Sequence, residues 1–287
     1  MVKLKPEIDN FEKAEWDLIL EPGKASRQYW FDLWKFRELF VILSWRDISV
    51  RYKQTIIGVL WAFIRPFLTM IVFTLVFGKV AKLPSEGTAP YAIMVYAALL
   101  PWQFFASAVQ SSSNSLTTNS QLVSKVYFPR MIIPSSSIIT GIVDFIISFL
   151  VLFVLMFYYQ FYPTWNILLI PLLLLIALMT ALGVGLYITS LNVKFRDFRY
   201  IIPFIIQFGL YISPVGFSSS VIPEKYRLWY SLNPLVGVID GFRWAILGGE
   251  SQIYWNGFGL SLLVMFFFLW LGIRTFRKME KTFADMI

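Results

Sequence analysis

Long apolar stretches separated by short polar segments fill most of the chain after residue 56. Six of them approach the roughly 20 apolar residues that a helix needs to cross a bilayer. The six stretches lie near 57–78, 91–111, 134–159, 167–190, 201–219 and 253–273. The fourth is almost free of polar residues, whereas the second ends in SSSNS and is the least apolar. The pattern therefore predicts an all-α membrane protein with six transmembrane helices.

The region before the first span has an amphipathic pattern instead. At helical spacing, residues 29–50 gather five apolar side chains on one narrow stripe, and their charged residues fall elsewhere. The stripe consists of Trp30, Trp34, Val41, Trp45 and Ile48. Tryptophans on one stripe are typical of a helix that lies in the headgroup region of a membrane. The alternative is a soluble helix packed on its own domain, but the preceding tail, 1–28, is too short to provide a core.

A second irregular region, 221–249, precedes the last span. It is too apolar for a solvated loop and too interrupted by proline and glycine for a span. Pro223 and Pro234 stand where the first turn of a helix begins, and Asn233 is a favourable N-cap. Gly248-Gly249 is a natural helix stop. We therefore expect two short re-entrant helices in the outer leaflet, where such backbone survives only beside protein or a water-filled cavity.

Positive charge predicts the orientation. With both ends inside, twelve Lys and Arg residues flank the spans on the cytoplasmic side and five lie on the other side. The twelve are Arg46, Arg51, Lys53, Lys125, Arg130, Lys194, Arg196, Arg199, Arg274, Arg277, Lys278 and Lys281. The five are Lys79, Lys82, Lys225, Arg227 and Arg243, nearly cancelled by Glu86, Glu224, Asp240 and Glu250. The positive-inside rule therefore puts both tails, 1–28 and 276–287, in the cytoplasm, joined by a six-span domain over 51–275.

The composition excludes several classes of protein. Of 287 residues, 57% are hydrophobic and 15% charged, against roughly 25% charged in a soluble domain. Cysteine and histidine are absent, which removes thiolate metal sites and the commonest general base. The chain has no G-x-x-x-x-G-K-[ST] loop, so it cannot cradle ATP by itself and we expect no cofactor in it. The net charge of +8 comes from clusters at the ends of apolar runs, which indicates membrane topology and not nucleic-acid binding.

Two formal charges fall inside the predicted spans, Arg65 and Asp144. They have opposite signs and lie at similar depths, about 13 Å and about 15 Å from the cytoplasmic ends of their helices. An intramembrane charge usually finds a partner or a water-filled cavity. One hypothesis is that Arg65 pairs with Asp144 and locks the first span against the third. The other is that Arg65 faces a substrate path and meets phosphate.

The loop between the second and third spans, SLTTNSQLVSKVYFPRMIIP, has an unusual composition. A solvated turn has no need of Tyr127 and Phe128 beside two cations, Lys125 and Arg130. We therefore expect the loop to dock on a soluble partner. The alternative is a short interfacial helix with aromatic side chains at the membrane surface.

Four stretches resemble the signatures of a known family. They are WRDISVRYKQTIIGVLWAFIRP, SKVYFPRMIIP, LNVKFRDFRYIIPFIIQFGLYISPV and SLNPLVGVIDGFRWAIL. In this order and on this layout, they resemble the permease subunit of bacterial ABC exporters for lipid-linked polysaccharides, a group that includes O-antigen, capsule and teichoic acid exporters. The resemblance runs from about residue 29 to the C-terminus.

The resemblance implies a transporter subunit and not an enzyme. It would lie in the bacterial cytoplasmic membrane as a homodimer with two ATPase subunits, which bind the ATP and Mg. The path between the two permeases would be lined mainly by the first and fifth spans. The candidate path residues are Arg51, Lys53, Trp61, Arg65, Phe67, Phe204, Phe208 and Tyr211. The candidate coupling residues are Lys125, Val126, Tyr127, Phe128 and Arg130, and those of an outer gate are Asn233, Pro234 and Arg243.

Elementary chemistry agrees with such a path. A polyprenyl-pyrophosphate glycan needs cations for its pyrophosphate, which Arg51, Lys53 and Arg65 provide. It also needs aromatic faces for its sugars.

One alternative keeps the fold and changes the cargo to a drug, a lipid or a small glycoconjugate. Another is a membrane-embedded polyprenyl-phosphate transferase, but the sequence has no D-x-D motif or acidic cluster. A passive channel would leave the loop at 119–130 unexplained.

Overall fold

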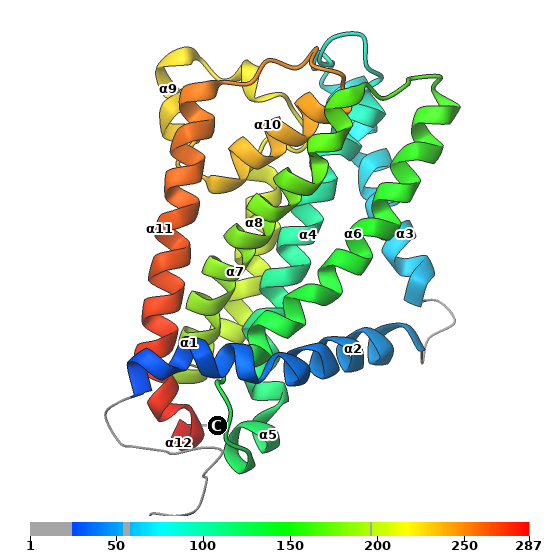
Figure 1. The fold of residues 1–287 in the computed structure, drawn as a ribbon. Helices are drawn as coiled ribbons and strands as arrows, with labels where there is room; N and C mark the ends of the chain where they lie inside the picture. Colours follow the sequence, from blue (N-terminus) through cyan, green and yellow to red (C-terminus); the bar gives the residue numbers. More distant parts are fainter. Residues whose placement is uncertain (1–24, 54–57, 196, 287) are drawn as a thin grey trace, which may run out of the picture.

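The apolar stretches form helices that run side by side between two ends of the molecule (Figure 1). The computed structural model describes residues 25–53, 58–195 and 197–286, which form helices, turns and coil without a strand. The longer helices are α1 (Ala25–Lys35), α2 (Arg37–Lys53), α3 (Gly58–Phe73), α4 (Tyr91–Thr118), α6 (Ile132–Tyr158), α7 (Ile170–Lys194), α8 (Phe198–Ile212), α10 (Pro234–Ile246) and α11 (Trp255–Met279). The shorter ones are α5 (Ser120–Lys125), α9 (Glu224–Tyr230) and α12 (Phe283–Met286), with η1 (Thr74–Val80), η2 (Trp165–Leu169), η3 (Ser219–Val221) and η4 (Glu280–Thr282).

Within the described ranges, five helical segments are long and apolar enough to cross a membrane. They are Leu60–Val80, Tyr91–Thr118, Ile132–Tyr158, Trp165–Lys194 and Trp255–Thr282. The stretch predicted as a span at 201–219 differs. Its helix, α8, has 15 residues, or about 22 Å at ~1.5 Å per residue, less than the hydrocarbon thickness of about 30 Å. The chain leaves the helix after Ile212 and turns through Ser213 and Val215, which are both buried.

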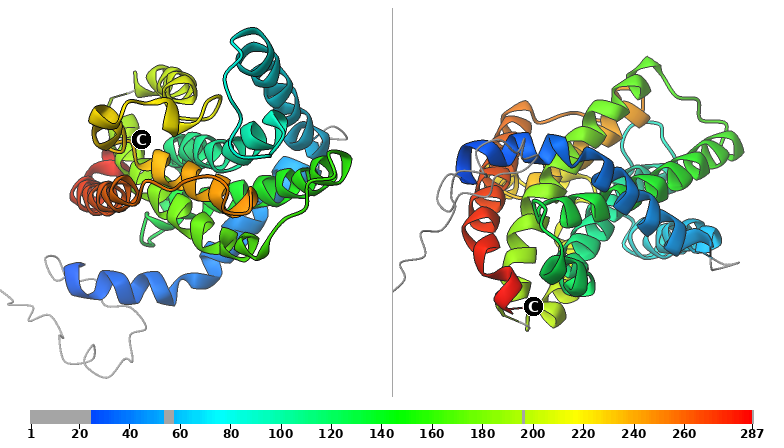
Figure 2. Two further views of the ribbon diagram at one scale, coloured as in Figure 1. Left: turned by 90° about the horizontal axis from the view of Figure 1, so that it is seen from above. Right: turned by 60° about the horizontal axis from the view of Figure 1, so that its bottom comes forward.

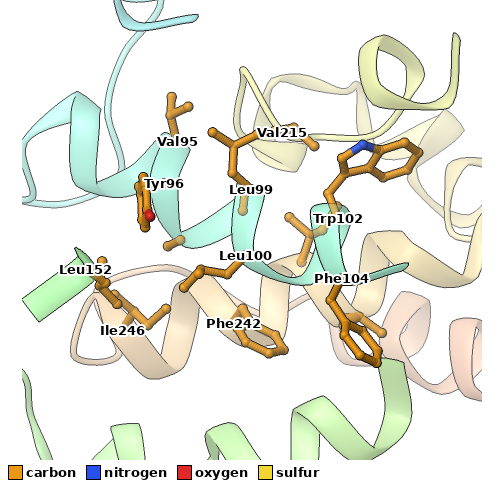
Figure 3. Packing of buried hydrophobic residues seen from close by; sticks show 14 of the residues in the cluster. Val95, Tyr96, Leu99, Leu100, Trp102, Phe104, Leu152, Val215, Phe242 and Ile246 are labelled. Atoms are coloured by element: carbon orange, nitrogen blue, oxygen red, sulfur yellow. The ribbon is translucent and has the colours of Figure 1, made fainter. Parts of the chain in front are cut away.

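The centre of the molecule is α4. It packs against α3, α6, α7, α8 and α10, and every residue from Ile93 to Ala98 is fully buried. Figure 3 shows Leu100 and Phe104 of α4 beside Phe242 and Ile246 of α10. The weak apolar character of this span follows from its place, because its surface faces protein and not lipid.

Polar and small residues join α7 to its two neighbours. Thr189 donates to the carbonyl oxygen of Ser112 on α4 at 2.9 Å, and Asn192 donates to that of Ser113 at 2.7 Å. On the other side, Gly183 meets α11 at Gly272, so closely that a Cβ on Gly272 would overlap the Gly183 carbonyl oxygen. Small residues of this kind let helix backbones approach closely within a membrane.

The two ends of the bundle differ (Figure 1). At the lower end, α1 and α2 lie across the helices, with α5 and α12 beneath them (Figure 2). At the upper end, α9 and α10 and the loops before α4 and α7 form a cap.

The predicted amphipathic helix at 29–50 is part of α1 and α2, which are interrupted at Phe36. The stripe residues Trp30, Trp34, Val41 and Trp45 are exposed by half or more. The opposite face packs on a second apolar cluster at the lower end, formed around Leu43, Phe128, Phe276 and Phe283. The outward face of α1 and α2 is therefore apolar and exposed, as is typical of a helix that lies at a membrane surface.

Candidate functional site

Helices α3 and α8 carry most of the predicted path residues. Both helices pack on α4 and leave a large part of their own surface uncovered. The side chains of Trp61, Phe204, Phe208 and Tyr211 are each more than half exposed, Arg65 is exposed and Phe67 is half-buried. We call this surface of α3 and α8 the aromatic face.

Ring contacts order the aromatic face. The rings of Phe204 and Phe208 lie 4.6 Å apart on α8. Phe67 stacks on Phe63 of α3 with centroids 5.5 Å apart. Phe73 of α3 lies 6.0 Å from Tyr211 of α8, so aromatic rings bridge the two helices near the cap. Aromatic rings bring large contact area with little conformational freedom, which suits a surface that meets a bulky ligand or a second protein chain.

Asp144 has a different partner from the predicted one. Its Oδ2 lies 2.7 Å from Nη2 of Arg51 at the end of α2, and the Tyr52 hydroxyl donates to its Oδ1. Within the described part of the chain, the ion pair of Asp144 is with Arg51 and not with Arg65. The reason is that α2 lies along α6, where Ser137 Oγ also donates to Asp47 at 3.2 Å. That crossing brings a cation from outside the spans to the Asp144 carboxylate.

The predicted coupling loop is exposed in part. Lys125, Val126 and Tyr127 are exposed at the lower end. Phe128 is buried in the second apolar cluster, so its ring is occupied by the chain itself. Of the five candidate coupling residues, those exposed to a partner are therefore Lys125, Val126 and Tyr127.

Arg130 is tied to the end of the last helix. Its backbone N–H donates to Glu280 Oε1 at 2.7 Å, and its guanidinium donates to the Glu280 carbonyl oxygen. The Tyr29 hydroxyl of α1 donates to the same carboxylate at 3.2 Å, and the Arg277 guanidinium lies over the Tyr29 ring. Glu280 thus joins the coupling loop, α1 and the C-terminal segment. The sequence signal for it, one acid among several cations, was too weak to predict this role.

The predicted gate residues lie in the cap. Asn233 caps α10 as expected, because its side chain accepts from the N–H of Leu235 at 3.1 Å and Pro234 occupies the first turn. Helix α10 ends at Ile246, shortly before Gly248 and Gly249, whose φ angles are +75° and +85°. The Nδ2 of Asn233 also donates to Ser213 Oγ at 2.9 Å, which links α10 to the turn after α8.

Arg243 is the centre of the cap and is fully buried. Its Nη1 donates to the Phe217 carbonyl oxygen at 2.9 Å and its Nη2 to that of Val215 at 3.0 Å. Its Nε donates to Met94 on α4 at 3.4 Å, and Nη1 lies 3.5 Å from Glu86 Oε1. One side chain therefore holds α10, α4, the turn after α8 and the loop before α4 together.

Two carboxylates lie beside this arginine, those of Glu86 and Asp240. Burial raises the pKa of Asp240 to about 7, and the Arg243 charge opposes that rise. Ser219 Oγ donates to Asp240 Oδ2 at 2.8 Å. The N–H of Thr88 donates to Glu250 at 2.6 Å and joins two loops of the cap. In the ranges 25–53, 58–195 and 197–286, no group of three His, Cys, Asp or Glu side chains is placed to hold a metal ion.

The chain belongs to a known family of transporters. The family model of the ABC-2 type transporter matches residues 38–247, from the start of α2 to the end of the cap. The match confirms the family that the four sequence stretches predicted. The chain is therefore a multi-pass membrane protein and a transporter subunit.

Named relatives cover nearly the same length. The chain is similar to the O-antigen export system permease protein RfbA of Klebsiella pneumoniae, with 28% identity over 260 residues, 87% of this chain and 95% of that protein. It is 28% identical to RfbA of Myxococcus xanthus over 214 residues, 74% of this chain and 81% of the relative. It is 21% identical to the polysialic acid transport protein KpsM of Escherichia coli over 239 residues, 82% and 91% of the two chains.

Proposed function

We propose that the chain is the membrane-spanning subunit of an ATP-driven exporter that moves a lipid-linked polysaccharide across the bacterial cytoplasmic membrane. The observation that carries this conclusion is the similarity, over most of the chain, to permeases whose names state O-antigen export or polysialic acid transport. Because the chain lacks a phosphate-binding loop, ATP and Mg would bind to a partner subunit.

The assembly we infer is a homodimer with two ATPase subunits. The aromatic face on α3 and α8 is the support for a second copy, because it is broad, apolar and left uncovered within one chain. In such a dimer, the path lies between two aromatic faces. The rings of Trp61, Phe67, Phe204, Phe208 and Tyr211 then meet the sugars. Arg51, Lys53 and Arg65 meet the phosphate groups nearer the lower end.

We further infer that α8 completes a sixth crossing. Helix α7 ends at the lower end and α11 begins at the cap, so the chain must return between them, and α8 is the helix that lies between. The Tyr230 hydroxyl donates to the Ile212 carbonyl oxygen at 2.6 Å, which ties the end of α8 to the cap. The short length of α8 is offset by the buried turn through Ser213 and Val215 that follows it. Six crossings put both termini at the lower end, where the predicted cytoplasmic cations gather.

The two ends then have separate roles. The exposed segment Lys125 to Tyr127 is the docking element for the ATPase, and Arg130 with Glu280 holds that element in place. The outer gate is the cap, with Asn233, Pro234 and Arg243 fixing α10. The tryptophans of α1 and α2 lie in the cytoplasmic headgroup layer. A drug, lipid or small glycoconjugate remains the alternative cargo for the same fold.

Deletion of the gene tests the function. The deletion strain should lose its surface polysaccharide and accumulate the lipid-linked form inside, and the wild-type chain should restore export. Tyr127→Asp should insert normally and fail to restore export, because it puts a charge into the docking element. Tyr162→Asp is the matched control at the other end, where Tyr162 is also exposed. Unaltered surface polysaccharide in the deletion strain would refute the proposal.

A further inference from the structure

The last turn of α2 binds an anion that belongs to the chain itself. Arg51 Nη2 lies 2.7 Å from Oδ2 of Asp144, and the Tyr52 hydroxyl donates to Oδ1. Ser107 Oγ of α4 donates to Oδ2 at 3.4 Å. Both oxygens of this carboxylate are thus bound, by donors from α2 and α4.

The same donors fit a phosphate group. A guanidinium binds carboxylate and phosphate oxygens with the same geometry, and binds phosphate strongly. Burial, together with the hydrogen bond to Asp144, raises the pKa of Tyr52, so its hydroxyl stays protonated and remains a donor at neutral pH. Lys53 is exposed in the same turn and adds a second cation.

The pair of Arg51 and Asp144 is built so that it can exchange. The Arg51 side chain is 42% exposed and that of Asp144 is 18% exposed, so an incoming anion can reach the guanidinium. The Arg51 end of the pair is open to solvent, which weakens an ion pair. If Arg51 and Tyr52 turn to another anion, Ser107 can still donate to Asp144, and the carboxylate is not left without a partner.

A second contact holds α2 on α6 independently. Ser137 Oγ donates to Asp47 Oδ2 at 3.2 Å, and Asp47 pairs with its neighbour Arg46 at 2.7 Å. This contact lies one turn away from Arg51 on the same two helices. Asp47 therefore provides a matched control for any substitution of Asp144.

We propose that Arg51 and Tyr52 form a binding site for a phosphate or pyrophosphate group, and that Asp144 occupies this site as a competing internal anion until the ligand displaces it. The inference deepens the proposed function and rests on it for the source of the ligand, the phosphate end of a lipid-linked glycan. Displacement releases the end of α2 from α6 immediately before the first span. Ligand binding and movement of α2 are therefore coupled.

Binding to the full chain in phosphatidylcholine nanodiscs tests the site. The probes are farnesyl pyrophosphate and inorganic pyrophosphate. Asp144→Asn should tighten binding about two- to fivefold, the range expected when a partly exposed ion pair no longer competes. Asp47→Asn should bind as the wild type does, and Arg51→Gln should bind at least tenfold more weakly. Unchanged affinity in Asp144→Asn, or wild-type affinity in Arg51→Gln, would overturn the proposal.

The source of the phosphate is read from the same titrations. Tighter binding of farnesyl pyrophosphate than of inorganic pyrophosphate supports a lipid-linked ligand, and equal binding supports the site with a soluble anion as its ligand. Nanodiscs with phosphatidylglycerol give the third arm. If that lipid competes with both probes in the wild type and in Asp47→Asn, the site takes a membrane headgroup.

A distance measurement tests the displacement first in a chain that keeps Asp144. The chain has no cysteine, so Val50→Cys on α2 and Ile146→Cys on α6 can carry two spin labels at exposed positions. Farnesyl pyrophosphate should lengthen the distance between the labels in the otherwise wild-type chain. Adding Asp144→Asn should give the longer distance without a probe. An unchanged distance in both cases would contradict displacement.

Export in cells separates this inference from the proposed function. If Asp144→Asn leaves probe binding and label distance unchanged while the wild-type chain exports polysaccharide, the internal anion is refuted and the function stands. If the titrations behave as proposed but the chain supports no polysaccharide export, the function is refuted and the phosphate site stands.

Discussion

Arg243 carries a charge where no solvent reaches it. Three backbone carbonyl oxygens and the Glu86 carboxylate surround its guanidinium. Desolvation of a charge is costly unless hydrogen bonds and a counter-charge replace the water, and here both are present. The arginine is thus a structural part of the cap, because it can be satisfied only while four segments stay together.

Removing Arg243 should destabilise the cap strongly. Arg243→Gln leaves Glu86, whose side chain is 10% exposed, without its counter-charge, and loss of a buried counter-charge typically costs about 3–5 kcal/mol. Arg227→Gln is the control, because Arg227 also donates to two carbonyl oxygens but lies nearer to solvent, so its loss should cost about 1 kcal/mol or less. Thermal unfolding in detergent measures both. Equal stability of the two variants would contradict the role of Arg243, whereas partial recovery on adding Glu86→Gln would support it.

At the scale of residues, sequence reasoning predicted the cap at Asn233 and gave one wrong expectation of contact. Asn233 could be predicted as a cap because capping is local in sequence. The partner of Asp144 could not, because depth along a helix says nothing of a third helix that crosses it. Arg51 reaches Asp144 only through the packing of α2 on α6.

At the scale of helices, the least apolar span proved to be the most buried one. Of the five long apolar segments, α4 has the largest buried share. The carbonyl oxygens of its Ser112 and Ser113 accept hydrogen bonds from α7. Hydropathy measures suitability for lipid, so it underrates a helix that is surrounded by protein. The length of α8 was overestimated for a related reason, since the apolar residues after Ile212 belong to a buried turn.

The contact between α7 and α11 depends on glycine. Gly272→Ala places a methyl group against the Gly183 carbonyl oxygen and should destabilise the chain by about 1–3 kcal/mol through overpacking. Gly259→Ala on the same helix meets nothing within 4 Å and should be neutral or slightly stabilising. Melting temperatures in detergent distinguish the two. A Gly272→Ala chain as stable as Gly259→Ala would show that α7 and α11 lie farther apart.

At the scale of the whole molecule, the two ends should face opposite sides of the membrane. Tyr162 and Gln252 are exposed beside the cap, and Tyr127 is exposed at the other end. A cysteine at 162 or 252 should react with an impermeant maleimide added outside intact cells. A cysteine at 127 should react only after the cells are permeabilised. Labelling at 127 from outside would reverse the orientation that the positive-inside rule predicts.

The order of the helices and the family could be predicted from the sequence because each is signalled by residues that are contiguous in the chain. Apolar runs mark the spans, and motifs such as SLNPLVGVIDGFRWAIL combine an N-cap and a proline at the start of a helix in one segment. Contacts between distant segments could not be predicted. Glu280 and Arg130 are 150 residues apart, and nothing in either segment signals the other.

Reconstitution tests the central claim most directly. The purified chain and its partner ATPase are placed in proteoliposomes that carry a lipid-linked polysaccharide on the ATP-accessible face. We predict that ATP moves the glycan to the opposite face, where a glycosidase added to the ATP side no longer cleaves it. Omitting this chain, or replacing it with Tyr127→Asp, should leave the glycan cleavable. If the glycan stays cleavable with the wild-type chain, ATP and an active ATPase all present, the chain is not a polysaccharide export permease.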